Sequence, residues 1–223
     1  MLFVHDVHVV AGKHEFEYED AVRDEYLPAV AADEDTRLLW YLYATHGSGN
    51  AYNIVTITAL RDATAWDRLV ERLRYGDLSE WSTRMAKLRY GLYSSLLVST
   101  EWSPLATLEL ATISATPADH PVALYREHSL SGPGLASTLA AAASQSGSGD
   151  DVLTVTAGFR PALGNDSRAQ VLYRITADND RWVNAFGTDI GWRDWSGSLT
   201  PTLSAGVTGS GRTLRTTTWS PLQ

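Results

Sequence analysis

The sequence predicts an α+β protein in which one strand-helix-strand-strand-helix-strand unit occurs twice in tandem. The tetrapeptide Trp-Ser-Pro-Leu occurs at residues 102–105 and again at residues 219–222. The length of 223 residues suffices for two units of about 110 residues each. Each half also switches between the two-residue period of strands and the longer period of helices. We therefore expect a first repeat at residues 1–105, a linker at 106–121 and a second, more divergent repeat at 122–223.

Further matches between the halves occur in the same order along the chain. Glu80–Ser82 corresponds to Asp194–Ser196, and the first predicted strands match in a way that aligns His8 with His128. A β-α-β-β-α-β unit is the ferredoxin-like pattern. Two such sheets, each with one open face, can pack sheet to sheet, so the expected fold is a pseudo-dimeric α+β barrel.

The first repeat is expected to contain four strands and two helical regions. The strands either alternate in polarity or are apolar on both faces, and they cover residues 2–10, 37–45, 52–60 and 92–102. The first helix covers residues 15–32, where Pro28 should kink or break it. The second helical region follows Asp62, a typical N-cap residue, and carries an apolar stripe.

The second repeat follows this pattern less regularly. Its strands are expected at residues 122–130, 152–159, 168–176 and 212–219, and its helices at residues 135–144 and 179–186. Serine and glycine dominate residues 144–149, which predicts a loop there. The glycine-rich stretch at residues 204–211 is expected to be a further loop, and residues 107–115 of the linker could form an extra strand.

Composition excludes several classes of protein. The net charge is −8, the isoelectric point is near 5.2 and basic residues do not cluster, which argues against binding to nucleic acid. The chain has no cysteine, so disulfides and thiolate sites are excluded. Its apolar runs are far shorter than the ~20 residues of a membrane span, and its start lacks the basic region of a signal peptide. We expect a cytoplasmic protein that does not contact membranes.

The catalytic candidates lie on the first strand of each repeat. Asp6 and His8 share one face of the first strand, and Arg126 and His128 share a face of its counterpart. A histidine titrates near neutral pH and can transfer protons, an aspartate can orient it, and an arginine can hold an enolate or a carboxylate. The alternative is that both histidines are hydrogen-bonded structural residues inherited from a common ancestor.

Aromatic residues supply the candidates for substrate binding. The chain has eight Trp and ten Tyr, which either fill the core or line a pocket for a flat ligand. The candidates are Trp40, Tyr41 and Tyr43 on the second strand, His46 at its end, and His5 and Tyr125 on the opposite faces of the first strands. Because His5 and His8 point to opposite faces, they cannot chelate a metal together, and we expect no metal and no organic cofactor.

One stretch resembles a known family. The residues HGSGNAYNIVTITALRDATAW, at positions 46–66, and the aromatic-rich helix around residues 16–28 are similar to the NIPSNAP family. This resemblance covers about the first 102 residues, and it implies the dimeric α/β-barrel fold. Relatives within that superfamily include polyketide cyclases, muconolactone-type isomerases, cofactor-free quinone-forming monooxygenases, haem-degrading oxygenases and chlorite dismutase. NIPSNAP proteins share no single activity, so the resemblance implies fold rather than function.

The leading functional hypothesis is a cofactor-independent enzyme of small-molecule, polyketide-like secondary metabolism. It would cyclise or isomerise an apolar or aromatic substrate by proton transfer. The alternatives are a cofactor-free monooxygenase, in which a stabilised carbanion reacts with O₂, and a non-catalytic NIPSNAP-like binding or structural protein. A haem enzyme is a further option. The expected partner is a small apolar or aromatic substrate, and the chain should be a monomeric pseudo-dimer or a homodimer.

Overall fold

The computed structural model describes residues 1–48, 51–143, 153–164, 167–176 and 207–223. The chain divides into two compact units that do not coincide with the sequence repeats. Unit 1 comprises residues 1–98, 109–123 and 213–223, and unit 2 comprises residues 99–108 and 124–212. No helix in the described part of the chain is both long and apolar enough to cross a membrane.

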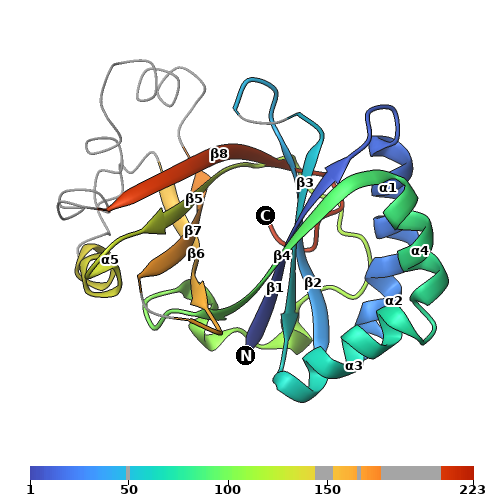
Figure 1. Ribbon diagram of the computed structural model, residues 1–223, viewed down its shortest axis with the longest axis horizontal. Helices are drawn as coiled ribbons and strands as arrows, with labels where there is room; N and C mark the ends of the chain where they lie inside the picture. The colour runs from blue at the N-terminus through green and yellow to red at the C-terminus, as the bar shows by residue number, and fades with distance from the viewer. Residues whose placement is uncertain (49–50, 144–152, 165–166, 177–206) are drawn as a thin grey trace. The chain divides into compact units, whose positions relative to one another are not determined.

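Unit 1 is built on an antiparallel sheet (Figure 1). Strand β1 (Leu2–Val10) lies between β3 (Asn53–Leu60) and β4 (Arg89–Ser99), and β3 also pairs with β2 (Thr36–Ala44). The last three residues of β8 (Thr208–Thr216) pair with β2. All eight residues of β3 are buried, as expected for a strand with both faces covered.

Helices cover one face of this sheet (Figure 1). The first helical stretch consists of α1 (Glu15–Ala21), a π-helical turn (Val22–Tyr26) and α2 (Leu27–Ala31). Pro28 lies in the first turn of α2, directly after the π-helical turn. A proline in a helix removes one hydrogen bond and crowds the preceding turn, so the wider π-helical turn lets the helix continue where the sequence predicted a kink or break.

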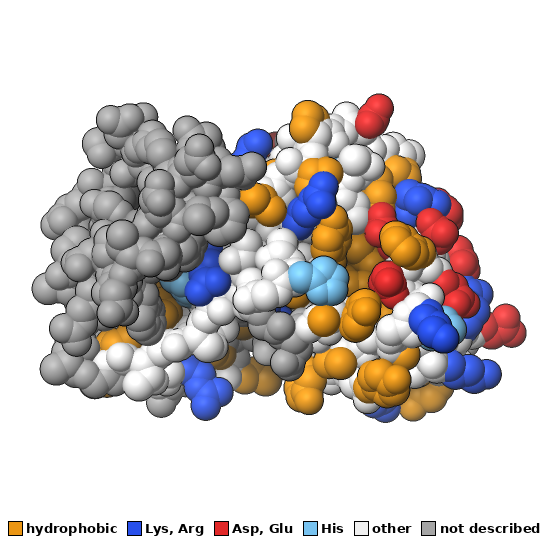
Figure 2. Space-filling model, turned by 90° about the horizontal axis from the view of Figure 1, so that it is seen from above, with side chains coloured by type: hydrophobic (Ala, Val, Ile, Leu, Met, Phe, Trp, Pro, Cys, Tyr) orange, Lys and Arg blue, Asp and Glu red, His pale blue; other side chains and the backbone are white. Residues whose placement is uncertain are grey.

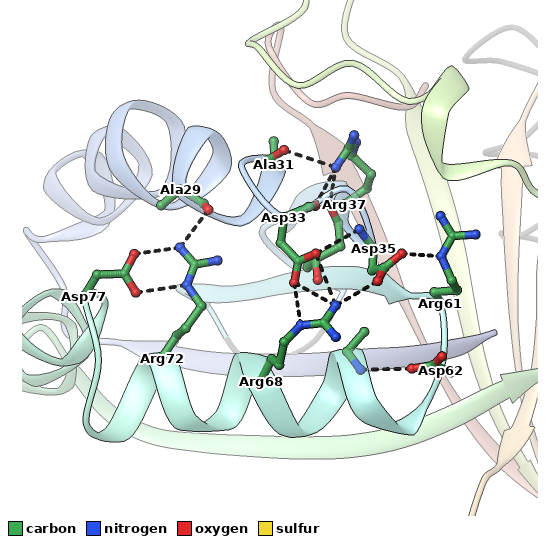
Figure 3. Close-up of polar contacts among 12 residues, drawn as sticks. Ala29, Ala31, Asp33, Asp35, Arg37, Arg61, Asp62, Arg68, Arg72 and Asp77 are labelled. Carbon is green, nitrogen blue, oxygen red and sulfur yellow. Dashed lines mark hydrogen bonds and ion pairs between the residues drawn. The ribbon is translucent and has the colours of Figure 1, made fainter.

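The second helical region of unit 1 contains α3 (Ala63–Arg74) and α4 (Ser79–Lys87). The Asp62 carboxylate accepts a hydrogen bond of 2.9 Å from the Ala65 N–H, which confirms the predicted N-cap. Figure 3 shows how arginines of α3 join neighbouring segments: Arg72 donates to Asp77 and to the Ala29 carbonyl, while Arg68 bonds the loop before β2. These contacts fix the helical layer over the sheet.

Unit 2 contains β5 (Leu124–Ser131), α5 (Leu135–Ala143), β6 (Leu153–Pro161) and β7 (Arg168–Ile175). Strand β7 pairs antiparallel with both β5 and β6. Leucines of α5 pack with apolar residues of β5 and β7 in a second core. The hydrogen-bonded strand order is β4-β1-β3-β2-β8 in unit 1 and β5-β7-β6 in unit 2.

The two Trp-Ser-Pro-Leu segments have equivalent positions. Each tryptophan comes three residues after the end of a strand, β4 or β8. The Ser103 hydroxyl accepts a hydrogen bond of 3.0 Å from the Gly158 N–H on β6, and the Ser220 hydroxyl accepts one of 3.1 Å from the Tyr41 N–H on β2. Because β2 and β6 are the second strands of the two repeats, the segment that ends each repeat is hydrogen-bonded to the second strand of the other repeat.

These anchors set the alignment of the repeats. Tyr41 on β2 and Asp6 on β1 pair with the same residue of β3, which lies between these two strands. Likewise, Gly158 on β6 and His128 on β5 pair with the same residue of β7. His128 therefore corresponds to Asp6 in strand register. The predicted alignment of His8 with His128 is wrong by two residues, although the two histidines do lie on equivalent strands. Matching letters cannot detect such a shift, because it comes from a change in the length of the chain between paired strands.

Several predicted boundaries also differ. Residues 107–115 do not form an extra strand; short 3₁₀ helices occupy Pro104–Thr107 and Leu110–Thr112, the first of them capped by the Ser103 hydroxyl. Strand β4 ends at Ser99, before Trp102, and β8 begins within the glycine-rich stretch that was expected to be a loop. The predicted loop at 144–149, the helix at 179–186 and the repeat motif Asp194–Ser196 lie outside the described residues.

Candidate functional site

A pocket of about 370 Å³ lies in unit 1, between α1 and the adjoining ends of β2 and β3. Its lining mixes aromatic, acidic and basic side chains. They are Glu15, Phe16, Glu19, Tyr41, Tyr43, Ala44, Thr45, His46, Tyr52, Asn53, Ile54 and Arg215. Hydrophobic side chains with acidic ones beside them also gather on the face drawn in Figure 2. A pocket of this size and character suits a small molecule with a flat apolar body.

Three polar atoms of this pocket are buried without a hydrogen-bond partner among the described residues. They are the hydroxyl of Tyr41, Oδ1 of Asn53 and Oε2 of Glu15. The Tyr41 side chain is 1% exposed and Asn53 is 8% exposed, so neither is hydrated like a surface group. Leaving a buried polar group unpaired costs about 1–3 kcal/mol. A polar ligand bound in this cavity would supply hydrogen-bond partners for all three groups.

Glu19 is the acid–base candidate in the pocket. Its Oε1 accepts a hydrogen bond of 2.8 Å from the indole N–H of Trp219. Burial raises the pKa of the Glu19 carboxyl, and the Trp219 hydrogen bond opposes this shift. Burial and the nearby charge of Glu19 also raise the pKa of Tyr41. A carboxylate with a raised pKa is a stronger base than an exposed one, and the neutral Tyr41 hydroxyl can still donate a hydrogen bond.

Aromatic rings and one cation complete the walls. The guanidinium of Arg215 lies 5.8 Å from the centre of the Tyr43 ring, within cation–π range. His46 meets Tyr52 edge to face, with 6.1 Å between ring centres. The pocket therefore has an aromatic surface next to its carboxylates.

His8 belongs to a separate hydrogen-bonded cluster beneath α1. The Tyr18 hydroxyl lies 2.7 Å from Nδ1, an Arg89 N–H donates to the same nitrogen over 3.0 Å, and Nε2 lies 3.0 Å from the Thr56 hydroxyl. Nδ1 therefore accepts, and Nε2 carries the proton that is donated to Thr56. Burial, and then the charge of Arg89, lower the pKa of His8 to about 3, so the ring is neutral at physiological pH.

Asp6 lies on the same face of β1, but its environment differs from the one expected. Burial raises its pKa, while a hydrogen bond from Ser94 and the charges of His5 and Arg89 oppose the shift. Its Oδ1 has no hydrogen-bond partner among the described residues. Asp6 and His8 share no hydrogen bond, and the charged side chain that bonds His8 is instead Arg89, the first residue of β4.

Arg126 and His128 are in direct contact in unit 2, as their predicted shared face requires. The Arg126 side chain donates to Nε2 of His128 over 3.2 Å. Burial lowers the pKa of His128 to about 3, and the charge of Arg126 acts in the same direction. The His128 ring also meets Tyr173 edge to face, with 5.5 Å between centres. His128 is thus a packed residue, with only 3% of its surface exposed.

The structure brings together only part of the predicted site. Tyr41, Tyr43 and His46 line the unit 1 pocket, whereas Trp40 and His5 do not, and both of the latter are buried. Tyr125 is fully buried in unit 2 and lines neither of the two pockets described for this protein. The catalytic roles predicted for His8, Asp6, His128 and Arg126 remain predictions.

The sequence analysis did not select the four pocket residues that carry a carboxylate, an amide or a guanidinium group: Glu15, Glu19, Asn53 and Arg215. The spacing of Glu15 and Glu19, one helical turn apart, places both on one side of α1. That spacing was the available signal. It was not decisive, because acidic residues at this spacing usually face solvent.

Comparisons with solved structures define the fold. A proposed monooxygenase from Lactobacillus acidophilus matches with a TM-score of 0.59 and 11% identity, covering 97% of this chain and 94% of its own. A proposed monooxygenase from Fusobacterium nucleatum matches with a TM-score of 0.51 and 11% identity over 98% and 95%. A proposed chlorite dismutase matches with a TM-score of 0.54 and 9% identity over 97% and 94%. The chain has the dimeric α/β-barrel fold.

A NIPSNAP family protein from Agrobacterium tumefaciens also matches, over 47% of this chain and 90% of its own, with 18% identity and a TM-score of 0.40. No family model matches the sequence, and no curated protein does. Among the described residues, no group of three His, Cys, Asp or Glu side chains could hold a metal ion.

Proposed function

We propose that this protein is an enzyme of the monooxygenase type that oxidises a small, hydroxylated aromatic molecule bound in the unit 1 pocket. The observation that carries the proposal is the convergence of the unpaired Tyr41, Asn53 and Glu15 atoms on an aromatic-lined cavity. Asn53 Oδ1 and Glu15 Oε2 are acceptors, which phenolic hydroxyls of the ligand would satisfy. The Tyr41 hydroxyl would donate to a ligand carbonyl.

The chemistry assigned to the pocket is proton removal followed by reaction with O₂. Glu19, whose pKa is raised by burial, would take a proton from an activated CH₂ group of the substrate. A carbanion that is stabilised by the aromatic system reacts with O₂ directly. The CH₂ group becomes a carbonyl by gaining one oxygen atom, and its two hydrogens leave with the second oxygen atom as water. Two matched proteins of this fold are proposed monooxygenases, which supports the choice of reaction.

Oxygen uptake with 1,8-dihydroxyanthrone tests the proposal, since this probe carries both phenolic hydroxyls and an activated CH₂ group. The full chain should accelerate O₂ consumption above the protein-free rate and incorporate one atom of ¹⁸O₂ into the product. Glu19→Gln should lower the rate by roughly 10²–10⁴-fold, as expected for loss of a general base. Tyr41→Phe should lower it less.

Glu71→Gln is the matched control, because Glu71 is an exposed carboxylate of α3 outside the pocket. It should retain the full rate. A product formed equally well without O₂ would favour the cyclisation or isomerisation predicted from the sequence. Tight binding without turnover would favour a binding protein. Equal rates for Glu19→Gln and the native chain would overturn the assignment of the base.

A further inference from the structure

Unit 2 contains a second pocket, of about 320 Å³, between α5 and the ends of β6 and β7. It is lined by Ser99, Thr100, Glu101, Trp102, Ala136, Leu139, Ala140, Arg160, Arg168 and Ala169. Among these lining residues, arginines contribute two positive charges and Glu101 contributes one negative charge. None of them belongs to the site proposed above.

The two pockets occupy equivalent places in the two repeats. The serine anchors make Tyr41 equivalent to Gly158, so Tyr43 of the unit 1 pocket corresponds to Arg160 of the unit 2 pocket. When this alignment is extended through the β2–β3 and β6–β7 pairings, Asn53 on β3 corresponds to Arg168 on β7. In both repeats the remaining wall is the helix that follows the first strand. The duplication has therefore preserved a cavity at the same place.

The two cavities differ in the charge and polarity of their walls. Where unit 1 presents the carboxylates of α1, the α5 wall presents Ala136, Leu139 and Ala140. Where unit 1 presents Tyr43 and Asn53, unit 2 presents two arginines. A wall that offers hydrogen-bond acceptors has become an apolar wall facing guanidinium groups. The favoured ligand changes from one that donates hydrogen bonds to one that carries negative charge.

Two arginines line the pocket at adjoining strand ends. Arg160 lies near the end of β6 and Arg168 is the first residue of β7. Arg168 makes no ion pair and no side-chain hydrogen bond with any residue that the structure describes. Guanidinium groups bind carboxylates through paired, charge-assisted hydrogen bonds.

Trp102 supplies a flat aromatic wall, and Gly158 makes room for it. A Cβ atom on Gly158 would lie 2.2 Å from the Trp102 ring, so the indole packs directly on the β6 backbone. Any side chain at position 158 would displace the ring. An aromatic ligand can stack on the indole while its acidic group reaches the arginines.

We propose that the unit 2 pocket binds a planar aromatic carboxylate, with Trp102 and α5 holding the ring and Arg160 and Arg168 holding the carboxylate. This site differs from that of the proposed oxidation and does not depend on it. Its ligand is selected by charge, whereas the unit 1 ligand is selected by hydrogen-bond donors.

Binding of 2-naphthoate and of 2-naphthol to the full chain, measured by isothermal titration calorimetry, tests the proposal. 2-Naphthoate should bind, and Arg168→Gln should raise its Kd by roughly 10- to 100-fold, as expected for loss of a charge-assisted hydrogen bond. Gly158→Ala should weaken it through displacement of Trp102. The Kd of 2-naphthol should be unchanged in Arg168→Gln.

Arg174→Gln is the control for the loss of one positive charge, because Arg174 is on the same strand but outside the pocket. Circular dichroism and thermal unfolding check that each variant folds. No binding of 2-naphthoate to the native chain would overturn the proposal. Binding that Tyr41→Phe abolishes and Arg168→Gln leaves intact would also overturn it, by placing the ligand in unit 1. Failure of the oxidation assay would leave this result unaffected.

Discussion

At the scale of single residues, His8 shows how burial and hydrogen bonding determine the protonation state of a histidine. Both ring nitrogens are engaged, one by Tyr18 and Arg89 and the other by Thr56. Protonation would bring a positive charge into a buried site beside Arg89. The ring is therefore suited to joining α1 to the sheet as a neutral hydrogen-bonding group.

The stability of the protein should fall in mild acid because of His8. Its pKa is about 3 in the folded chain and 6.5 when unperturbed, so the unfolded state takes up the proton first as pH falls. The stabilisation is complete above pH 6.5 and is lost progressively toward pH 3. Its slope approaches roughly 1.4 kcal/mol per pH unit. Urea unfolding between pH 7 and 4.5 measures it.

His8→Gln provides the comparison, since glutamine can hydrogen-bond but does not titrate. The unfolding free energy of this variant should fall less steeply with acid than that of the native chain. His128 keeps its own contribution in both proteins, because its pKa is also lowered to about 3. Identical slopes for the two proteins would show that His8 is not the group responsible.

At the scale of elements, β8 depends on a glycine. A Cβ atom on Gly211 would lie 2.4 Å from the His128 ring and 2.8 Å from the Arg126 guanidinium. Gly211→Ala should therefore lower the unfolding free energy by about 1–3 kcal/mol, the usual cost of overpacking. Thermal unfolding measures the change. Gly91→Ala in β4 is the control, because its nearest neighbour is 4.0 Å away. Equal stabilities would contradict the close packing.

Patterns within a strand or helix were readable from the sequence. The alternation of residues 2–10 predicted β1 with its observed bounds, and Asp62 predicted the start of α3. The start of β8 was missed because glycine normally indicates a loop, whereas Gly211 is needed for close packing. Contacts from other segments override local preference at such positions.

The site was only partly readable for the same reason. Tyr41 and Tyr43 could be selected as aromatic residues of a buried strand, but nothing in the sequence indicated that Glu19 would be half-buried and hydrogen-bonded to Trp219. That contact joins residues 200 positions apart. The correct alignment of the repeats likewise required the strand registers, because identical letters favoured His8 with His128.

At the scale of the whole molecule, residues 213–223 complete unit 1. Leu214 and Thr216 are fully buried, and Ser220 holds the Tyr41 N–H. A chain that ends at residue 211 should therefore lose the cooperative unfolding of unit 1, because it exposes apolar surface and leaves buried backbone groups unpaired. Hydrogen exchange of β2 and β3 amides measures this loss. Protection in these strands equal to that of the full chain would contradict the prediction.

The reciprocal serine anchors have a consequence for how the protein is made. During synthesis, β2 leaves the ribosome well before Ser220 exists, and all of unit 2 is translated in between. Until then, the β2 backbone and the surface that later packs against Trp219 stay uncovered. Contacts between residues so distant in sequence form slowly, and exposed strand edges favour association with other chains. The nascent chain should therefore depend most on chaperones in the interval between translation of residue 60 and residue 220.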